Sequence, residues 1–251
     1  MRILLVSDIH ANARALRAVL DKFDDADEVW CLGDIVEYGP CPGECVELVR
    51  QHCRYVVQGN HDRSFADFKP AVGKGGWAAL DHHTVAVDDI DHLRGLPASL
   101  SVQADGCAYR LVHGSPQDPL AGRLQPDTPA DAIEAALDGC DETNILCGHT
   151  HIAMVTHAAG KRVINAGTIG QPRDGDYRAQ CMLIDDGDVR FERVDYDLEG
   201  LEQDYAASCL PQAVKAEWVD YTRRGVVDVH GLQLGPFSLS RHCPEKAARL
   251  G

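Results

Sequence analysis

Residues 54–62 read RYVVQGNHD, and this stretch decides which fold we expect for the chain. Its first half is an apolar run typical of a strand. Its second half places an amide, an imidazole and a carboxylate side by side, at Asn60, His61 and Asp62. Such a strand end is either an ordinary turn or one corner of a metal site. These residues alone leave both interpretations open, so the rest of the chain has to separate them.

The bulk composition is that of a globular protein with an acidic surface. The 251 residues are 45% hydrophobic and 25% charged, which is enough to build one large α/β domain. The net charge of −15 argues against binding long nucleic acid, whereas a small phosphate-bearing substrate remains compatible with a local metal centre. No apolar run approaches the roughly 20 residues of a membrane span. We therefore expect a cytoplasmic protein without a membrane partner.

The ten cysteines are scattered along the chain, and no pair has C-x-x-C spacing. Several of them lie inside apolar strand-like runs, where a cysteine behaves as a small buried hydrophobe. In a reducing compartment we expect these thiols to be free and inert.

The first half of the chain alternates strands and helices. This order predicts a parallel sheet with crossover helices. Strands are expected at 2–7, 28–34 and 54–60, with helices at 13–23 and 43–53 between them.

The second half is dominated by strand hairpins. Residues 99–115, 154–167 and 181–194 each read as two strands joined by a glycine-containing turn. A helix at 128–139 and a strand at 143–150 separate the first two hairpins. The whole predicts a four-layer α/β/β/α sandwich with mixed sheets, in one domain over 1–230. Its C-terminal part is helical over about 198–224, and a tail covers 231–251.

Residues with lone pairs gather where the predicted strands end. In open α/β sheets the carboxyl ends of the strands line the ligand crevice, so these residues are expected to converge. Carboxylate, imidazole and amide donors together suit manganese, iron, zinc or nickel better than calcium or magnesium. Any one histidine alone is more typical of a surface or core position, but five such strand ends in one chain favour a site. The candidate ligands are Asp8, His10, Asp34, Asn60, His113, His149 and His151.

Five motifs in fixed order resemble the calcineurin-like metallophosphoesterase superfamily. They are SDIH, GDIV, GNHD, VHG and GHTH, and the resemblance covers roughly residues 1–195. It is strongest to the small bacterial and archaeal branch of predicted phosphoesterases, in which GDIVxYGP, VHGSP and GQPRDGD also occur. The metal site is accordingly expected at the carboxyl ends of the strands.

The resemblance also assigns roles to individual residues. It implies two divalent transition-metal ions, with manganese expected and iron, zinc or nickel as alternatives. By this resemblance Asp34 would bridge the two ions, and His61 would lie beside the reacting phosphate, where it is placed to act as an acid. Asp62 either orients His61 or caps the following helix. The resemblance implies that one ion is held by Asp8, His10 and His151, and the other by Asn60, His113 and His149.

The implied activity is a phosphodiesterase on a small or nucleotide-like ester. Two cations clamp the phosphoryl group and lower the pKa of a bridging water, whose hydroxide attacks phosphorus. A phosphomonoesterase on the same centre, a catalytically silent scaffold and a binuclear peptidase are the alternatives. Glu37 and Tyr38 replace the Asp-Arg pair of the phosphoprotein phosphatases, which argues against that activity.

Two residues are candidates for binding the substrate. Arg173, in the loop QPRDGD, is suited to bind a phosphate oxygen. An arginine that only projects into solvent from a turn would have the same sequence context. Asn12 either contacts the bound anion or caps the helix that follows it. The sequence does not define the oligomeric state, and a homo-oligomer is compatible with it.

Overall fold

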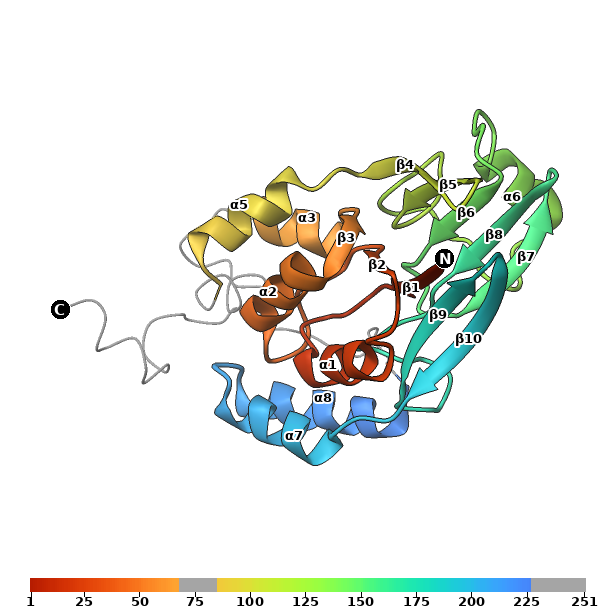
Figure 1. Ribbon diagram of the computed structural model, residues 1–251. Helices are drawn as coiled ribbons and strands as arrows, with labels where there is room; N and C mark the ends of the chain where they lie inside the picture. Colours follow the sequence, from red (N-terminus) through yellow and green to blue (C-terminus); the bar gives the residue numbers. More distant parts are fainter. Residues whose placement is uncertain (68–84, 227–251) are drawn as a thin grey trace.

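Two five-stranded sheets form the centre of the molecule, in the computed structural model that describes residues 1–67 and 85–226 (Figure 1). The predicted tail 231–251 and residues 68–84 lie outside the described residues. The first sheet has the order β10-β9-β1-β2-β3 and the second the order β4-β5-β6-β8-β7. The strands are β1 (Arg2–Val6), β2 (Glu28–Cys31), β3 (Cys53–Val56), β4 (Ser99–Ala104), β5 (Cys107–Val112), β6 (Asn144–Cys147), β7 (Met154–Ala158), β8 (Lys161–Asn165), β9 (Ala179–Asp185) and β10 (Asp188–Val194).

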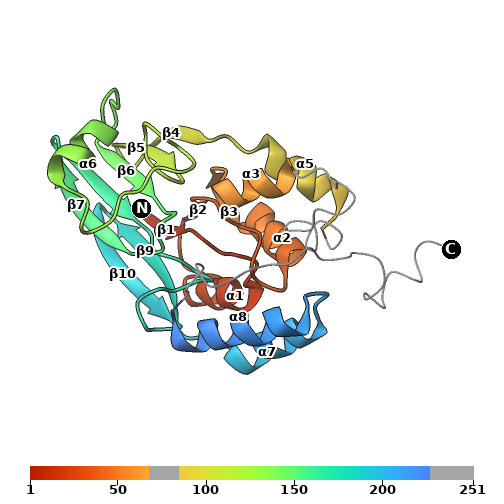
Figure 2. The ribbon, with the colours of Figure 1, turned by 180° about the vertical axis from the view of Figure 1, so that it is seen from behind.

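Helices cover the outer faces of both sheets (Figures 1 and 2). On the outer side of the first sheet, α1 contacts β9 and β10, and α7 in turn contacts α1 and α8. On the far side of the second sheet lies α6, which contacts β7. The helices are α1 (Ala13–Lys22), α2 (Pro42–His52), α3 (Asn60–Ala66), α5 (Val87–Gly95), α6 (Ala130–Ala136), α7 (Leu198–Ala207) and α8 (Gln212–Arg224).

Strand β1 shows how the layers are held together. Successive side chains of a strand point to opposite faces of its sheet. Ile3 and Leu5 accordingly pack into the core between the two sheets, together with Trp30. Leu4 and Val6 pack into a second core against the helices. A third core joins the second sheet to α6, so the four-layer α/β/β/α sandwich with mixed sheets is confirmed.

The strand directions bring the predicted site together at one edge. β1, β2 and β3 are parallel, as are β5, β6 and β8. The three predicted hairpins are present as the antiparallel pairs β4–β5, β7–β8 and β9–β10. Within each sheet, therefore, the loops that follow the parallel strands emerge at the same edge.

The ends of the helices follow local sequence signals. Pro42 occupies the first turn of α2, where its missing N–H costs no hydrogen bond. Gly225 ends α8 in the left-handed conformation, at φ 60°. No helix in the ranges 1–67 and 85–226 is long and apolar enough to cross a bilayer.

For the nine cysteines within the described residues, the expectation of free thiols holds with one exception. Eight described cysteines are free thiols. Cys209, between α7 and α8, is disulfide-bonded, so the expectation that all ten thiols are free was wrong.

Candidate metal centre

All seven predicted ligands meet at the facing edges of the two sheets. They form two clusters whose donor atoms lie within 4.8 Å of one another in each cluster: Asp8, His10 and His151 in one, and Asp34, His113 and His149 in the other. Asp34 joins the clusters, because its Oδ2 lies 3.8 Å from His10 Nε2 and 3.1 Å from His113 Nε2. Asn60 completes the second cluster, with Oδ1 3.1 Å from His113 Nε2.

Backbone carbonyls fix the orientation of three histidines. Nδ1 of His113 lies 2.8 Å from Leu32 O, and Nδ1 of His151 lies 2.8 Å from Gln171 O. His10 has a longer contact of this kind, to Val36 O at 3.4 Å. A ring that donates from Nδ1 carries its lone pair on Nε2, which is the usual arrangement of a metal-binding histidine. The three Nε2 atoms all face the clusters.

Asp8 has one carboxylate oxygen that is suited to bind a cation. Its Oδ2 accepts hydrogen bonds from Ser7 Oγ at 2.6 Å and from the His149 N–H at 3.0 Å. Its Oδ1 is buried without a hydrogen-bond partner among the described residues, and it lies 3.0 Å from His151 Nε2. A buried carboxylate oxygen that faces imidazole lone pairs is suited to a cation between them.

The backbone of the ligand loops is strained. Asp8, His10, Asp34, His149 and His151 all adopt left-handed conformations, with φ between 47° and 66°. This region costs a non-glycine residue roughly 1–3 kcal/mol, and such residues cluster at functional sites. The five ligands are therefore held in conformations that only the surrounding structure supports.

Two motif glycines make room for the ligands. A Cβ on Gly59 would collide with the side chain and backbone nitrogen of Asp34, and a Cβ on Gly148 would collide with Ser7 and Asp8. The glycines of GNHD and GHTH are therefore required by the close approach of the ligand loops.

The charges at the site favour cation binding. Burial opposes ionisation, but neighbouring imidazoles outweigh it and hold the pKa of Asp8 and that of Asp34 below the usual range. Burial lowers the pKa of His10, and it lowers that of His149 to about 4. In His113 the charge of Asp34 outweighs burial and raises the pKa to about 10. Metal ligands bind in the deprotonated form, and the directions of these pKa shifts favour that form in Asp8, Asp34, His10 and His149, whereas His113 would have to lose a proton to bind a cation. The residues fit divalent transition-metal cations.

Comparison with known proteins gives the family. Residues 1–187 match the sequence model of the calcineurin-like phosphoesterase superfamily domain. The chain belongs to this superfamily. An uncharacterized protein of Methanocaldococcus jannaschii is 32% identical over 238 residues, which cover 84% of this chain and 94% of that protein.

Further similarities agree with the membership. The structure of a metallophosphoesterase from Sphaerobacter thermophilus superposes with a TM-score of 0.79 at 31% identity, and 90% of this chain and 100% of that chain are covered. The symmetrical bis(5'-nucleosyl)-tetraphosphatase of Erwinia tasmaniensis is 30% identical over 98 residues, or 37% of this chain and 36% of that protein. The expectation of a calcineurin-like phosphoric ester hydrolase is confirmed by the family.

In this phosphoesterase, His61 has a partner that the sequence reasoning missed. Its Nδ1 lies 2.5 Å from Glu37 Oε2, and its Nε2 lies 3.3 Å from the Tyr38 hydroxyl. Burial lowers the pKa of His61, but the charges of Asp34 and Glu37 outweigh it and raise the pKa to about 9. Glu37 and Tyr38 have left-handed backbones, at φ 68° and 72°. The signal was present in the sequence, because these are the two residues that depart from the phosphoprotein phosphatase pattern.

Asp62 does not orient His61, because the hydrogen bond to the His61 ring is made by Glu37. Both oxygens of the buried Asp62 carboxylate face backbone N–H groups instead. They accept from Asp34 and Ile35, each at 2.8 Å, and from Gly59 at 2.9 Å. The Gly59 contact caps the first turn of α3, which was the alternative interpretation. Asp62 therefore holds the loop of the Asp34 ligand against the helix that carries His61.

The two predicted substrate-binding residues differ in their surroundings. Arg173 lies beside the first cluster, with one terminal nitrogen 3.5 Å from His151 Nε2 and 2.8 Å from Gln171 Oε1. Asn12 caps α1 by accepting from the Ala15 N–H at 3.1 Å, and its amide nitrogen lies 3.3 Å from the Tyr196 hydroxyl. Both polar groups of Asn12 are thus engaged within the protein, which agrees with the capping interpretation.

Proposed function

We propose that this phosphoesterase binds two divalent metal ions, manganese being the expected metal, and hydrolyses small, nucleotide-like phosphodiesters. The position of Asp34 carries the proposal. Its carboxylate lies between the histidines of the two clusters, 3.8 Å from His10 Nε2 and 3.1 Å from His113 Nε2. Seven ligands exceed one coordination sphere, and a shared carboxylate is the link that two neighbouring cations require.

Different residues of the protein would hold the two cations. Asp8, His10 and His151 would hold one ion, Asn60, His113 and His149 the other, and Asp34 both. Bound cations supply a nucleophile of lowered pKa and neutralise charge that develops on the phosphoryl oxygens.

His61 is placed to assist the leaving group. Glu37 accepts from Nδ1–H, which fixes the ring and leaves Nε2 at the cleft beside Tyr38. A departing alkoxide needs a proton, and an imidazolium that contacts Glu37 and lies in the field of the Asp34 charge is able to donate it. His61 would therefore act on the leaving oxygen, while the seven predicted ligands would hold the cations.

Two features support a nucleotide-like substrate. Arg173 places a guanidinium beside the first cluster, and the chain as a whole carries a net charge of −15. A cation at this point suits a second anionic group of the substrate. The partial match to a bis(5'-nucleosyl)-tetraphosphatase points the same way.

A matched pair of chromogenic esters tests the proposal. We expect the protein reconstituted with Mn²⁺ to hydrolyse bis-p-nitrophenyl phosphate with a higher kcat/KM than p-nitrophenyl phosphate. Asp8→Asn should abolish both activities, whereas Asp131→Asn, on the exposed side of α6, should leave them unchanged. Preference for the monoester would contradict the diesterase assignment, and absence of turnover on both would indicate a scaffold.

A further inference from the structure

A tyrosine hydroxyl lies at the candidate metal centre, beside the histidine that is proposed to serve the leaving group. The Tyr38 oxygen is 3.3 Å from His61 Nε2, and the two ring centroids are 4.8 Å apart. The ring of His10, a predicted ligand of the first cluster, lies 4.9 Å from that of Tyr38 and 5.1 Å from that of His61. Tyr38 therefore adjoins both the first cluster and the proposed acid.

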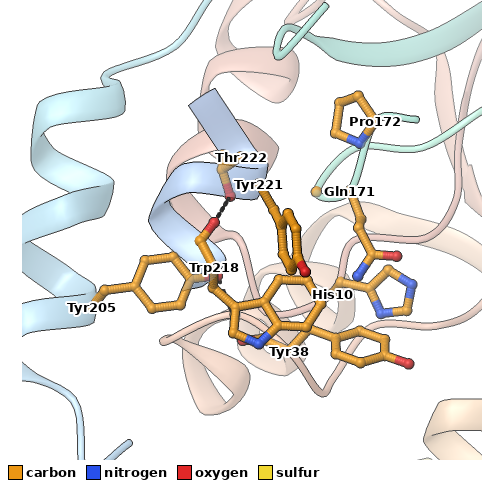
Figure 3. A pocket seen from close by; sticks show the side chains of 10 residues that line it. His10, Tyr38, Gln171, Pro172, Tyr205, Trp218, Tyr221 and Thr222 are labelled. Carbon is orange, nitrogen blue, oxygen red and sulfur yellow. Dashed lines mark hydrogen bonds between the residues drawn. The ribbon is translucent and has the colours of Figure 1, made fainter. Parts of the chain in front are cut away.

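The backbone and the packing of Tyr38 fix the position of its ring. Its backbone is left-handed, at φ 72°, a conformation that non-glycine residues adopt where the surrounding structure imposes it. The next residue, Gly39, donates its N–H to His10 O at 3.1 Å, and a Cβ on Gly39 would lie 2.3 Å from that oxygen. The Tyr38 ring also packs on Trp218 at 4.9 Å, and Figure 3 shows its hydroxyl pointing away from the indole. The hydroxyl is therefore held at the site rather than free to swing.

The Tyr38 hydroxyl has hydrogen-bonding capacity that the protein does not use. A hydroxyl offers one donor and two acceptor positions. Within the part of the chain that the structure describes, its only hydrogen-bond partner is His61 Nε2, which uses one of these positions. In the proposed reaction His61 Nε2 serves the leaving oxygen, so the hydroxyl is available to a second oxygen of the same phosphate. A tyrosine keeps its proton at neutral pH, and the group is therefore a donor without charge.

The groups around His61 leave a phosphate in need of such a donor. The carboxylates of Asp34 and Glu37 only accept hydrogen bonds. The backbone N–H of His61 is already used, because it donates to Asp34 Oδ1 at 2.9 Å. A donor that is held toward a phosphoryl oxygen stabilises the negative charge that develops there during hydrolysis. The Tyr38 hydroxyl is placed to supply this hydrogen bond.

We propose that the Tyr38 hydroxyl donates a hydrogen bond to a non-bridging oxygen of the reacting phosphate. Tyr38 is then a catalytic residue that acts on the phosphoryl group, while His61 acts on the neighbouring leaving oxygen. A donor without charge does not reward the second negative charge of a phosphomonoester, which agrees with a diester substrate. This inference rests on the proposed function, because it takes the phosphate to lie at the metal clusters.

Steady-state kinetics of Tyr38→Phe, in the full chain loaded with Mn²⁺, test the inference. The substitution removes the hydroxyl and keeps the ring that packs on His10 and Trp218. We expect kcat/KM for bis-p-nitrophenyl phosphate to fall about ten- to a hundredfold, the effect of one hydrogen bond to a charged group. An alkyl diester should show the same fold loss, because both esters have the same non-bridging oxygens. Manganese content should be unchanged, since the hydroxyl is not a metal ligand.

The outcomes separate the hydroxyl from the activity as a whole. Tyr55→Phe is the matched control, because Tyr55 packs on Trp30 in the core between the sheets, and it should keep the kcat/KM of the unmodified chain. An unchanged kcat/KM in Tyr38→Phe contradicts the inference and leaves the proposed activity intact. A loss that shrinks for the p-nitrophenolate leaving group would place the hydroxyl on the leaving oxygen, and a loss of manganese would assign Tyr38 to support of the His10 loop. Either result overturns the inference, whereas absence of turnover in the unmodified chain contradicts the proposed function itself.

Discussion

The candidate metal centre and the aromatic cluster beside it are built in opposite ways. The centre is made of loops with left-handed backbone at five of its seven predicted ligands. The cluster takes Trp218 and Tyr221 from α8, whose backbone is regular helix, and packs Trp218 against Tyr38 (Figure 3). Holding cations requires donor atoms at fixed positions, and the fold stores strain to place them. Packing rings into a core requires only apolar surfaces, which a helix supplies without strain.

The difference predicts two kinds of mutational effect. Substitutions at the centre should lower turnover, because they act on the reacting phosphate. Substitutions in the loop of Arg173 should change affinity, because they act on the remainder of the substrate. Each of the following substitutions is expected to affect either turnover or substrate affinity.

His61 should show the largest effect among residues that bind no metal. We expect His61→Gln to lower kcat for an alkyl diester by about 10²–10⁴-fold, the usual contribution of general acid catalysis, with metal content unchanged. A p-nitrophenolate leaving group scarcely needs a proton, so the loss should shrink for bis-p-nitrophenyl phosphate. Steady-state kinetics on the two esters measures the difference, and equal losses would argue against an acid role.

Glu37 should act through His61. We expect Glu37→Gln to lower kcat by about 10–100-fold, as for other residues that orient groups at a metal site. The charge of Glu37 helps to raise the pKa of His61, so its removal lowers that pKa. Activity that needs protonated His61 is lost as pH rises through this pKa. The alkaline limb of the pH profile should therefore move to lower pH.

The control for Glu37 is Glu44→Gln, on α2, where Glu44 pairs with Arg17 away from the site. It should leave both kcat and the pH profile unchanged. An alkaline limb that stays in place in Glu37→Gln would show that Glu37 does not act on the proton of His61.

Arg173 should show a smaller effect, and on affinity. A charge-assisted hydrogen bond contributes about 1.5–3 kcal/mol, so Arg173→Ala should raise KM for a multiply charged nucleotide about tenfold or more. The KM for a simple aryl phosphodiester should change much less. Arg178→Ala, in the same loop but paired with Asp176, is the control. Equal effects on both substrates would place Arg173 on the reacting phosphate instead.

Much of the metal centre was predictable from the sequence, because its residues follow predicted strands. Asp8, Asp34 and His113 each follow the end of an apolar strand by one to three residues, and parallel strands carry their carboxyl ends to one edge. Short motifs thus specify both the ligand and its place in the fold. The roles of these ligands as a dinuclear centre remain a prediction.

The contacts of Glu37 and Asp62 were less predictable. Both depend on how the loop after β2 folds back onto α3, and the left-handed backbone at Glu37 sets the direction of its side chain. No periodic pattern of hydrophobic residues in the sequence indicates such a turn. The place of the aromatic cluster was not predicted either, because Trp218 and Tyr221 have the spacing of an ordinary core-facing helix stripe. Only the packing of α8 against Tyr38 shows that these rings adjoin the site.

Metal stoichiometry tests the central claim most directly. The purified chain loaded with Mn²⁺ and freed of excess metal should contain two equivalents per chain by elemental analysis, because two donor clusters share Asp34. Asp34→Asn should lower the content to one equivalent or less. A firm value of one in the unmodified chain that stays at one in Asp34→Asn would contradict the dinuclear centre.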